Sequence, residues 1–464
     1  MKPSLPSTIL TLLAALTLLL LVPARAGAQG ALTCGAMSTG AIAVPGEQDT
    51  WTLTANVGDA IVVRIGAITQ AGNFTPRVRI YDPGSTLRGS SYSTVAAEVA
   101  ITAASSGTYT VVVDDASAGT TGTGTYRITL AQTGTAVTVS PGDQGGPLVN
   151  GAIETGTIDI GDLDLWTVAA NSGDAIVVRI GELSTSEALD PWLRIYSPTG
   201  TLMATSYGTS AAEVTVNATA GTGTYLVVVG DANAGIAATG DYRLTLAETG
   251  VPVTVSPGDE GGALPAGLST GAIGVGDLDV WTVSASAGNS VIVSMSETAV
   301  GQTLQPWLRL YGPTGTLLQT IYGASHAQLS VTAPSTGTYL VVAADASSGL
   351  GGTGNYWITP SAAAGVDAPA RPLELALSAG GPNPFAGRTT LRYALPHDGP
   401  VSLRLFDAQG RLVRTLADGG SEAGEHTATW DGRDAGGGRA NPGVYLARLE
   451  ADGRRLVQRV VLVR

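Results

Sequence analysis

Asp164-Leu165-Trp166 determines how the chain is organised, because the same motif occurs twice more. The other copies are Asp49-Thr50-Trp51 and Asp279-Val280-Trp281, and each copy lies 115 residues from the next. A constant period over this much sequence indicates a tandem array of equivalent units. The motif therefore predicts three similar domains, and it argues against a single catalytic centre in this part of the chain.

The repeat extends well beyond the motif. Tyr81, Tyr196 and Tyr311 keep the same spacing of 115 residues. The spacer Val137-Thr138-Val139-Ser140-Pro141-Gly142-Asp143 returns as Val253-Thr254-Val255-Ser256-Pro257-Gly258-Asp259, and each Pro-Gly-Asp turn marks a joint between units. We place the repeats at residues 31–134, 148–250 and 264–361.

Each unit is rich in short strand signals. Ala60-Ile61-Val62-Val63-Arg64-Ile65 and Tyr109-Thr110-Val111-Val112-Val113 are β-branched runs bounded by turn-forming residues. About eight such runs in roughly 100 residues are typical of a β-sandwich. No window has apolar residues at helical spacing, so we expect almost no helix in the mature chain.

The N-terminal residues 1–28 have the pattern of a signal peptide. Lys2 gives a positive start, an apolar run extends from Ile9 to Val22, and Ala26-Gly27-Ala28 forms a cleavage site that would make Gln29 the first mature residue. No later apolar run approaches the roughly 20 residues that a membrane helix needs. The sequence predicts an exported chain without a transmembrane span.

Charge and cysteine content narrow the class of protein. A net charge of −13 and a pI of about 4.6 exclude a nucleic-acid partner, which needs a basic surface. From Arg371 onward the balance reverses, with 13 Arg against 10 Asp plus Glu. Cys34 is the only cysteine, which excludes an intrachain disulfide. We favour a free thiol over a lipid anchor, because Thr33 replaces the small residue that lipidation requires.

Repeat 2 carries a family resemblance. Three of its segments, in order, resemble the bacterial pre-peptidase C-terminal domain. They are Gly161-Asp162-Leu163-Asp164-Leu165-Trp166, Asp190-Pro191-Trp192-Leu193-Arg194-Ile195-Tyr196 and Gly223-Thr224-Tyr225-Leu226-Val227-Val228-Val229. The resemblance covers all three repeats and implies jelly-roll-like β-sandwiches, some of which bind calcium. The peptidase that usually precedes this domain is missing.

After a low-complexity linker, residues 372–464 form a different strand-rich unit with Ig-like features. Asn383-Pro384-Phe385 and the closing Val460-Val461-Leu462-Val463-Arg464 resemble the type A sorting domain of the type IX secretion system. Trp430-Asp431-Gly432-Arg433-Asp434 more closely resembles the Ig-like domain of flagellar hook-capping proteins. We favour the sorting domain because the other end carries an export signal. It implies export and type IX secretion machinery as partners, and an extracellular or outer-surface location.

Enzymatic motifs are absent from the sequence. There is no His-Glu-x-x-His, no Gly-x-Ser-x-Gly and no phosphate-binding loop that leads into a helix. His326 is the only histidine in the repeats, and its counterparts are not histidines, which favours a surface residue over a catalytic base. We therefore expect a protein that is not an enzyme and that has no cofactor, except for calcium if the carboxylates described next bind it.

A pair of carboxylates two residues apart precedes each motif tryptophan. Such pairs can converge on one cation, and calcium prefers carboxylate oxygens. Two carboxylates fall short of the six to eight oxygens that calcium takes, and a turn carboxylate can instead accept bonds from its own backbone. Both interpretations are open for the pairs, which are Glu47 and Asp49, Asp162 and Asp164, and Asp277 and Asp279.

Tryptophan occurs in two settings. The motif tryptophans are expected to form the core of each sandwich. Alternation places Trp192 and Arg194 on one strand face, as it does Trp307 and Arg309, while repeat 1 has Arg77 at the Trp position. These pairs are candidate exposed patches for polysaccharide or extracellular protein. The alternative is that they pack against the neighbouring repeat.

Together these features predict an exported, non-catalytic protein that displays three binding sandwiches with avidity. Two alternatives remain open. One is an accessory carbohydrate- or protein-binding component of a secreted hydrolase system, and the other is a structural surface-layer protein.

Overall fold

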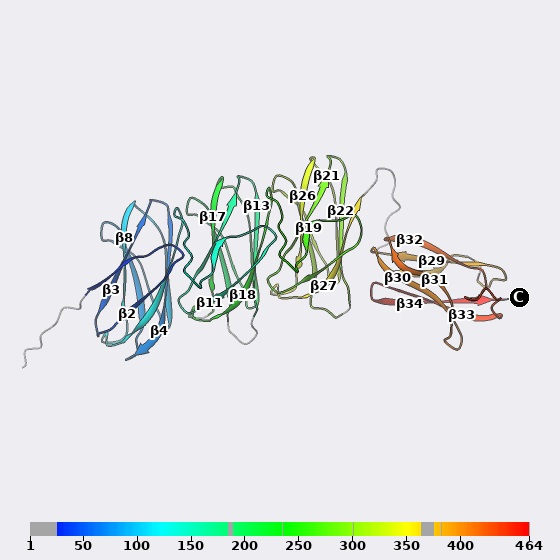
Figure 1. Cartoon of the computed structure of the whole chain (residues 1–464), viewed down its shortest axis with the longest axis horizontal. Helices are drawn as coiled ribbons and strands as arrows, with labels where there is room; N and C mark the ends of the chain where they lie inside the picture. The colour runs from blue at the N-terminus through cyan, green and yellow to red at the C-terminus, as the bar shows by residue number, and fades with distance from the viewer. Residues whose placement is uncertain are drawn as a thin grey trace, which may run out of the picture.

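The computed structural model describes residues 26–183, 189–233, 235–299, 301–362, 375–381 and 383–463. Within these ranges every regular element is a β-strand, and none is a helix. Figure 1 shows three similar sandwiches side by side, followed by a fourth at the C-terminal end. The expected all-β fold, with three jelly-roll-like sandwiches and a C-terminal sandwich, is confirmed.

Each repeat is built from a five-stranded and a four-stranded sheet. In repeat 1 the five-stranded sheet has the order β1 (Ala26–Ala31), β3 (Gln48–Ala55), β8 (Gly107–Asp115), β5 (Pro76–Tyr81), β6 (Leu87–Tyr92). The four-stranded sheet has the order β2 (Met37–Ile42), β9 (Thr123–Gln132), β4 (Ala60–Ala71), β7 (Ala96–Thr102). Counted from β2 as strand one, the eight antiparallel strands have the orders 2-7-4-5 and 1-8-3-6, which is a jelly roll.

Repeats 2 and 3 have the same topology. The five-stranded sheet of repeat 2 contains β10 (Gly145–Pro147), β12 (Asp164–Ala170), β17 (Gly223–Asp231), β14 (Pro191–Tyr196) and β15 (Leu202–Tyr207). Its four-stranded sheet contains β11 (Ile153–Ile158), β18 (Gly240–Glu248), β13 (Ala175–Glu182) and β16 (Ala211–Asn217). In repeat 3 the corresponding strands are β19 (Gly261–Ala263), β21 (Asp279–Ala285), β26 (Gly337–Asp345), β23 (Pro306–Tyr311) and β24 (Leu317–Tyr322), with β20 (Ser269–Ile273), β27 (Gly354–Ala362), β22 (Ser290–Glu297) and β25 (His326–Thr332).

Alternation along the strands explains the core of each sandwich. In β12, Trp166, Val168 and Ala170 point into the interior of repeat 2, where they pack with buried residues from the opposite sheet. Trp51 and Trp281 have the same place in repeats 1 and 3. Because one large apolar ring per repeat is buried this way, the motif tryptophans are core residues, as predicted.

The spacers belong to the sheets rather than lying between domains. β10 and β19 pair in parallel with β12 and β21, so repeats 2 and 3 include residues before the expected starts at 148 and 264. β1 pairs with β3 in the same way in repeat 1. Residues 26–28 of the expected signal peptide form the start of β1, and residues 1–25 lie outside the described part of the chain.

The C-terminal unit is a separate sandwich with its own core. One sheet has the order β28 (Ala376–Ala379), β29 (Thr389–Leu395), β32 (Gly424–Trp430), and the other has the order β31 (Leu412–Ser421), β30 (Gly399–Asp407), β33 (Gly443–Ala451), β34 (Arg454–Leu462). Trp430 is fully buried, contacts Phe385 and Tyr445 edge to face, and donates its indole N–H to the Arg433 carbonyl at 2.8 Å. This tryptophan is structural, as its sequence context suggested.

Candidate metal centres

A chain of hydrogen bonds fixes the aspartate of each Asp-x-Trp motif. In repeat 2 the Trp166 indole donates to the Tyr242 hydroxyl at 3.0 Å, and that hydroxyl donates to Asp164 Oδ2 at 2.5 Å. Gly156 makes room for the ring, since a Cβ there would lie 2.3 Å from the Tyr242 hydroxyl. The carboxylate is therefore held rigidly inside the sheet. The equivalent triads are Trp51, Tyr126 and Asp49, and Trp281, Tyr356 and Asp279.

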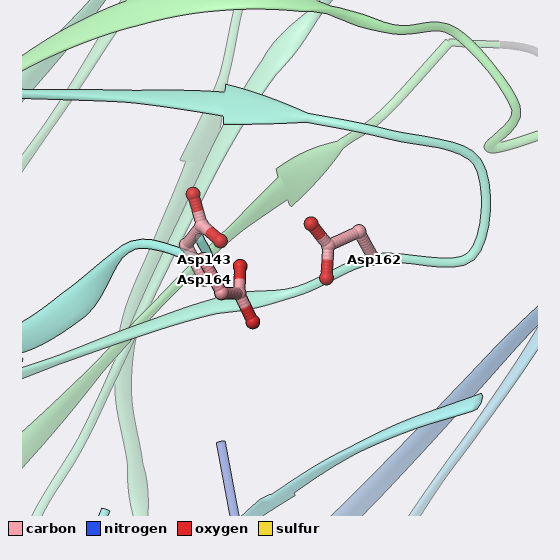
Figure 2. Close-up of side chains that lie close together, drawn as sticks. All are labelled: Asp143, Asp162 and Asp164. Atoms are coloured by element: carbon pink, nitrogen blue, oxygen red, sulfur yellow. The ribbon is translucent and has the colours of Figure 1, made fainter. Parts of the chain in front are cut away.

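In repeat 2 three carboxylates converge beside this anchor. Asp143 comes from the spacer turn, Asp162 from the turn before β12 and Asp164 from β12 itself, as Figure 2 shows. One oxygen from each lies within 4.8 Å of the others. Among the described residues no hydrogen-bond donor reaches Asp164 Oδ1 or Asp143 Oδ2, although both atoms are buried. An uncompensated buried oxygen is costly, so this arrangement calls for a proton or a cation.

The electrostatics of the cluster lead to the same conclusion. Burial, reinforced by the charge of Asp143, raises the pKa of Asp162 to about 6. Burial and the neighbouring carboxylates also raise the pKa of Asp164 well above its usual range. Like charges this close disfavour joint ionisation, and a bound cation reverses that effect.

Repeat 3 forms a related cluster from a slightly different set. Asp259, Glu260 and Asp279 each place one oxygen within 4.8 Å of the others. Asp279 Oδ1 and Asp259 Oδ2 are buried and have no donor among the described residues. Asp277 instead accepts from the Gly274 backbone N–H at 3.1 Å and from Arg243 at 3.3 Å. The expected partner of Asp279, Asp277, is thus not part of this cluster, and the spacer residues Asp259 and Glu260 join Asp279 instead.

Repeat 1 gathers no such cluster among its described residues. Both oxygens of Asp49 have donors, with Gln29 Nε2 at 2.8 Å and the Tyr126 hydroxyl at 2.7 Å. Glu47 accepts the backbone N–H groups of Ala43 and Val44 at 2.6 and 3.0 Å. Glu47 thus caps its turn, which was the alternative interpretation. The expectation that Glu47 and Asp49 form a cation site is not supported by this geometry.

The donor set in repeats 2 and 3 suits a hard cation. Calcium takes six to eight oxygens from carboxylates, carbonyls and water, and three carboxylates, two of them with orphaned oxygens, supply the charged part of that shell. Sequence reasoning missed Asp143, Asp259 and Glu260. The signal was present, because both spacers repeat Val-Thr-Val-Ser-Pro-Gly-Asp, but only the parallel pairing of β10 and β19 brings their carboxylates to the motif.

The candidate ligand patches lie instead at the joints between repeats. The Arg194 guanidinium lies 4.1 Å from the Trp192 ring centre and binds Glu98 of repeat 1 at 2.6 and 3.1 Å. Arg64 binds the same carboxylate at 2.9 Å. The second joint has the same arrangement, with Arg309 beside Trp307 and with Arg309 and Arg179 both bound to Glu213.

Arg194 and Arg309 are only 3% exposed, so the prediction of exposed cationic patches is wrong for both arginines. Trp192 and Trp307 are half-buried beside them. The physical reason is that each arginine finds its counter-charge on the preceding repeat, and a desolvated ion pair excludes water from the strand face. The alternative interpretation, packing against the neighbouring repeat, describes the structure.

Close backbone approach and apolar contacts complete each joint. Leu163, Leu165 and Val228 of repeat 2 pack against Ala60 and Val62 of repeat 1 in one buried cluster, and an equivalent cluster fills the second joint. A Cβ on Gly66 would lie 2.5 Å from the Gly161 backbone nitrogen, and Gly181 and Gly276 approach each other as closely. The five-stranded sheet of one repeat therefore stacks tightly on the four-stranded sheet of the repeat before it.

The outer faces of the array differ from the joint faces. In repeat 1, Gln48 and Thr50 stand where repeat 2 has Leu163 and Leu165, and Arg77 and Arg79 pair with Asp114 of their own sheet. In repeat 3, Ser294 stands at the position of Arg179, Gln328 at that of Glu213, and Ser296 at that of Gly181. The Gln328 side-chain amide donates a hydrogen bond to the Ser294 hydroxyl at 2.7 Å. Polar outer faces are what terminal repeats of an array require. The two end faces therefore lack the groups that form the joints.

Two other singled-out residues are also contact residues. The His326 ring lies 3.7 Å from the His397 ring of the C-terminal sandwich, and burial together with that second histidine lowers the pKa of His326 to about 4. Cys34 is buried at the first joint, where burial raises the pKa of its thiol to about 11. The expected surface histidine is therefore half-buried, and the thiol is an unreactive core group.

Comparison with known families identifies one part of the chain. Residues 384–454 match the model of the FlgD Ig-like domain. This match covers Trp430 to Asp434, the segment that suggested a hook-capping resemblance, and it stops before the closing Val460 to Arg464. No curated protein matches the sequence. The pre-peptidase resemblance of the three repeats remains a prediction.

Solved structures offer only distant similarity. One is PorZ, an essential bacterial surface component of the type IX secretion system of Porphyromonas gingivalis, with 21% identity over 24% of this chain and 14% of that chain and a TM-score of 0.15. Dimeric latent PorU from the same bacterium is 12% identical over 70% of this chain and 33% of that chain, with a TM-score of 0.17. The chain spans well under two thirds of either protein, and TM-scores this low assign it neither a fold nor a function. Because the described residues contain no helix, none of them forms an apolar helix long enough to cross a bilayer.

Proposed function

We propose that this protein is an exported, non-catalytic rod of three jelly-roll sandwiches, displayed at the outer cell surface and loaded with calcium in repeats 2 and 3. The observation that carries the calcium assignment is the convergence of three carboxylates in each of these two repeats, two of which have a buried oxygen without a donor. Repeat 1 serves as an internal contrast, because the Gln29 amide occupies the corresponding place beside Asp49.

Calcium at these positions would hold each spacer against the repeat that follows it. Asp143 and Asp259 lie on the spacers, whereas Asp164 and Asp279 are anchored in the sheets by tyrosine hydroxyls. A cation shared by both groups ties each spacer to the repeat that follows it. A ligand that binds only the folded state stabilises it by about 2.7 kcal/mol at a concentration 100 times its Kd.

The test is thermal unfolding of the mature chain with and without calcium. The double variant Asp143→Asn with Asp259→Asn removes one carboxylate from each cluster. Asp82→Asn is the matched control, because Asp82 is a single turn carboxylate of repeat 1 that accepts the Thr86 N–H at 2.8 Å. Calcium should raise the unfolding midpoint of the wild type and the control but not of the double variant. An equal calcium effect in all three proteins would remove the proposed sites.

Surface display rests on the two ends of the chain. Residues 1–28 have a signal-peptide pattern, and the C-terminal sandwich carries the sorting resemblance together with the FlgD Ig-like match. We assign the C-terminal sandwich the role of a type IX sorting domain, with the secretion machinery as its partner. Fractionation of cells that express full-length protein or a chain lacking residues 372–464 tests this. Full-length protein should reach the outer surface and the truncated chain should stay in the periplasm. Unchanged surface localisation of the truncated chain would refute the sorting role.

The end faces of the array favour a binding role over a structural layer. A layer built by stacking repeats end to end would need outer faces like those at the joints, and both outer faces are polar. Three equivalent units on one chain instead provide avidity for a repetitive surface. An accessory component of a secreted hydrolase system is the second candidate, since it needs the same binding units. Light scattering of the purified chain in calcium separates these roles, because monomers fit binding and extended assemblies fit a layer.

A further inference from the structure

Each repeat carries one tyrosine that is largely exposed to solvent. Tyr92, Tyr207 and Tyr322 are 65%, 71% and 68% exposed. They end β6, β15 and β24, which are edge strands of the five-stranded sheets, and they keep the period of 115 residues. Single exposed apolar residues are common on protein surfaces, but recurrence at the same place in all three repeats distinguishes these rings from scattered ones.

These strands have diverged everywhere except at their two ends. Only the first residue, a leucine, and the last, a tyrosine, are identical in all three repeats, and none of the four positions between them keeps one residue throughout. The leucines are themselves 46–49% exposed. Packing constrains buried positions most strongly, so retention at the most exposed positions of a variable strand indicates contact with something outside the chain. These leucines are Leu87, Leu202 and Leu317.

The fold makes no visible use of the three phenols. Among the described residues no group lies within hydrogen-bonding distance of their hydroxyls, and none of the three rings belongs to a core cluster. Tyr207 lies directly opposite Trp192 across the strand pair. The Trp192 indole is held in place by its bond to Thr205 at 2.8 Å and by the Arg194 guanidinium. The edge of each joint thus presents a free phenol next to a fixed indole.

The three tyrosines form a row. Both joints are made by equivalent residues, including the Arg64 and Arg179 ion pairs, so each repeat is displaced from the last in the same way. Figure 1 shows the resulting parallel placement of the three sandwiches. Equivalent surface residues, the three tyrosines among them, therefore recur at a regular interval along the array.

We infer that Tyr92, Tyr207 and Tyr322 form a binding row for a neutral polysaccharide chain. Exposed aromatic rings stack on the C–H faces of sugars, and phenol hydroxyls can bond to sugar hydroxyls. A polymer with regularly repeated units can contact all three rings at once, which multiplies weak single-site affinity. This inference rests on the proposed role of the repeats as binding units.

The surroundings of the tyrosine rings favour a neutral polysaccharide over a protein partner, an anionic glycan or an anionic membrane. A protein partner needs a contiguous patch of about 800 Å² per side, whereas the leucine and tyrosine of each strand are five residues, roughly 16 Å, apart. The net charge of −13 and the absence of lysine after Lys2 disfavour anionic glycans and anionic membranes.

Affinity electrophoresis of the purified mature chain tests the inference. The gels contain one of four soluble neutral polysaccharides: hydroxyethyl cellulose, xyloglucan, mixed-linkage β-glucan or galactomannan. At least one should retard the wild type. The variant with all three tyrosines changed to serine should lose roughly 100-fold or more in affinity, because avidity from linked sites reaches about 10² to 10⁴. A second triple variant changes Leu87, Leu202 and Leu317 to serine, and it should lose less affinity than the tyrosine variant, because it removes exposed apolar area but no ring that can stack on a sugar.

Either of two results would overturn the inference. One is that none of the four polysaccharides retards the wild type, and the other is that the tyrosine variant binds as the leucine variant does. Unfolding midpoints of both variants should stay close to that of the wild type, since all six side chains are exposed. The assay uses purified protein and neither calcium nor sorting, so its failure would leave the calcium and localisation experiments to decide the proposed function separately.

Discussion

The buried ion-pair cluster at the first joint predicts a large loss of stability on replacing Glu98 by Gln. Glu98 lies between two arginines, with Arg64 Nε at 2.9 Å and Arg194 Nη1 at 2.6 Å. The side chains of Arg64, Glu98 and Arg194 are 1%, 11% and 4% exposed. Burial opposes the charge of Glu98, but the two guanidinium groups outweigh it and lower its pKa. The substitution therefore leaves two buried cations without a counter-charge.

The expected magnitude follows from the burial of the cluster. Removing one partner of a buried ion pair costs about 3–5 kcal/mol. For a cooperative unit of 150–250 residues, each kcal/mol lowers the midpoint by about 2–4 °C, so Glu98→Gln should lower it by roughly 6–20 °C. Calorimetry of the full mature chain measures this shift. Proteolysis should also cut between repeats 1 and 2 sooner in the variant.

The C-terminal sandwich provides a matched control. Glu450 also lies between two arginines, Arg448 at 3.4 Å and Arg455 at 2.9 Å, but its side chain is 35% exposed. An exposed pair contributes about 0–1 kcal/mol, so Glu450→Gln should shift the midpoint little. Equal shifts for Glu98→Gln and Glu450→Gln would show that the buried cluster does not hold the joint.

Three further predictions concern single positions. Burial raises the pKa of Glu248 from 4.5 to about 8 in the folded protein. Because the folded state holds this proton more tightly than the unfolded state, the free energy of unfolding falls as the pH rises from about 4.5 to about 8. Repeat 1 has Gln132 at the equivalent position. Glu248→Gln should therefore raise the unfolding midpoint more at pH 8 than at pH 5, and a gain independent of pH would contradict this. Tyr242→Phe removes the donor to Asp164 and should cost about 1–3 kcal/mol in urea unfolding, whereas a neutral effect would mean that the bond is not formed. Gly66→Ser puts a Cβ within 2.5 Å of the repeat 2 backbone and should cost about 1–3 kcal/mol in the same assay, and a stable variant would show that the joint is looser than described.

Local patterns were enough to predict the strands and the core. Strand runs, turn residues and the motif tryptophans are short-range signals, and the period of 115 residues shows that they occur three times. Alternation also placed Trp192 and Arg194 on one strand face. It could not decide whether that face meets water or another repeat, because the counter-charge Glu98 lies 96 residues away in another sheet. The contrast between Thr50 and Leu165, which occupy the same outward position, was the available clue.

The metal clusters also combine contacts that the sequence predicts with contacts that depend on residues far apart in the chain. Asp162 and Asp164 are neighbours in sequence, so their pairing was predictable. Asp143 joins them only because the spacer folds back to form a parallel strand, which no local pattern announces. The exception in repeat 1 depends on one amide, Gln29, whose contact with Asp49 also requires that parallel strand.

The number of calcium ions bound per chain tests the central claim most directly. Native mass spectrometry of the mature chain, residues 29–464, after equilibration with calcium counts them. The structure predicts two ions, one in repeat 2 and one in repeat 3, and one ion after Asp164→Asn. No bound ion, or three ions with one for each repeat, would contradict the account.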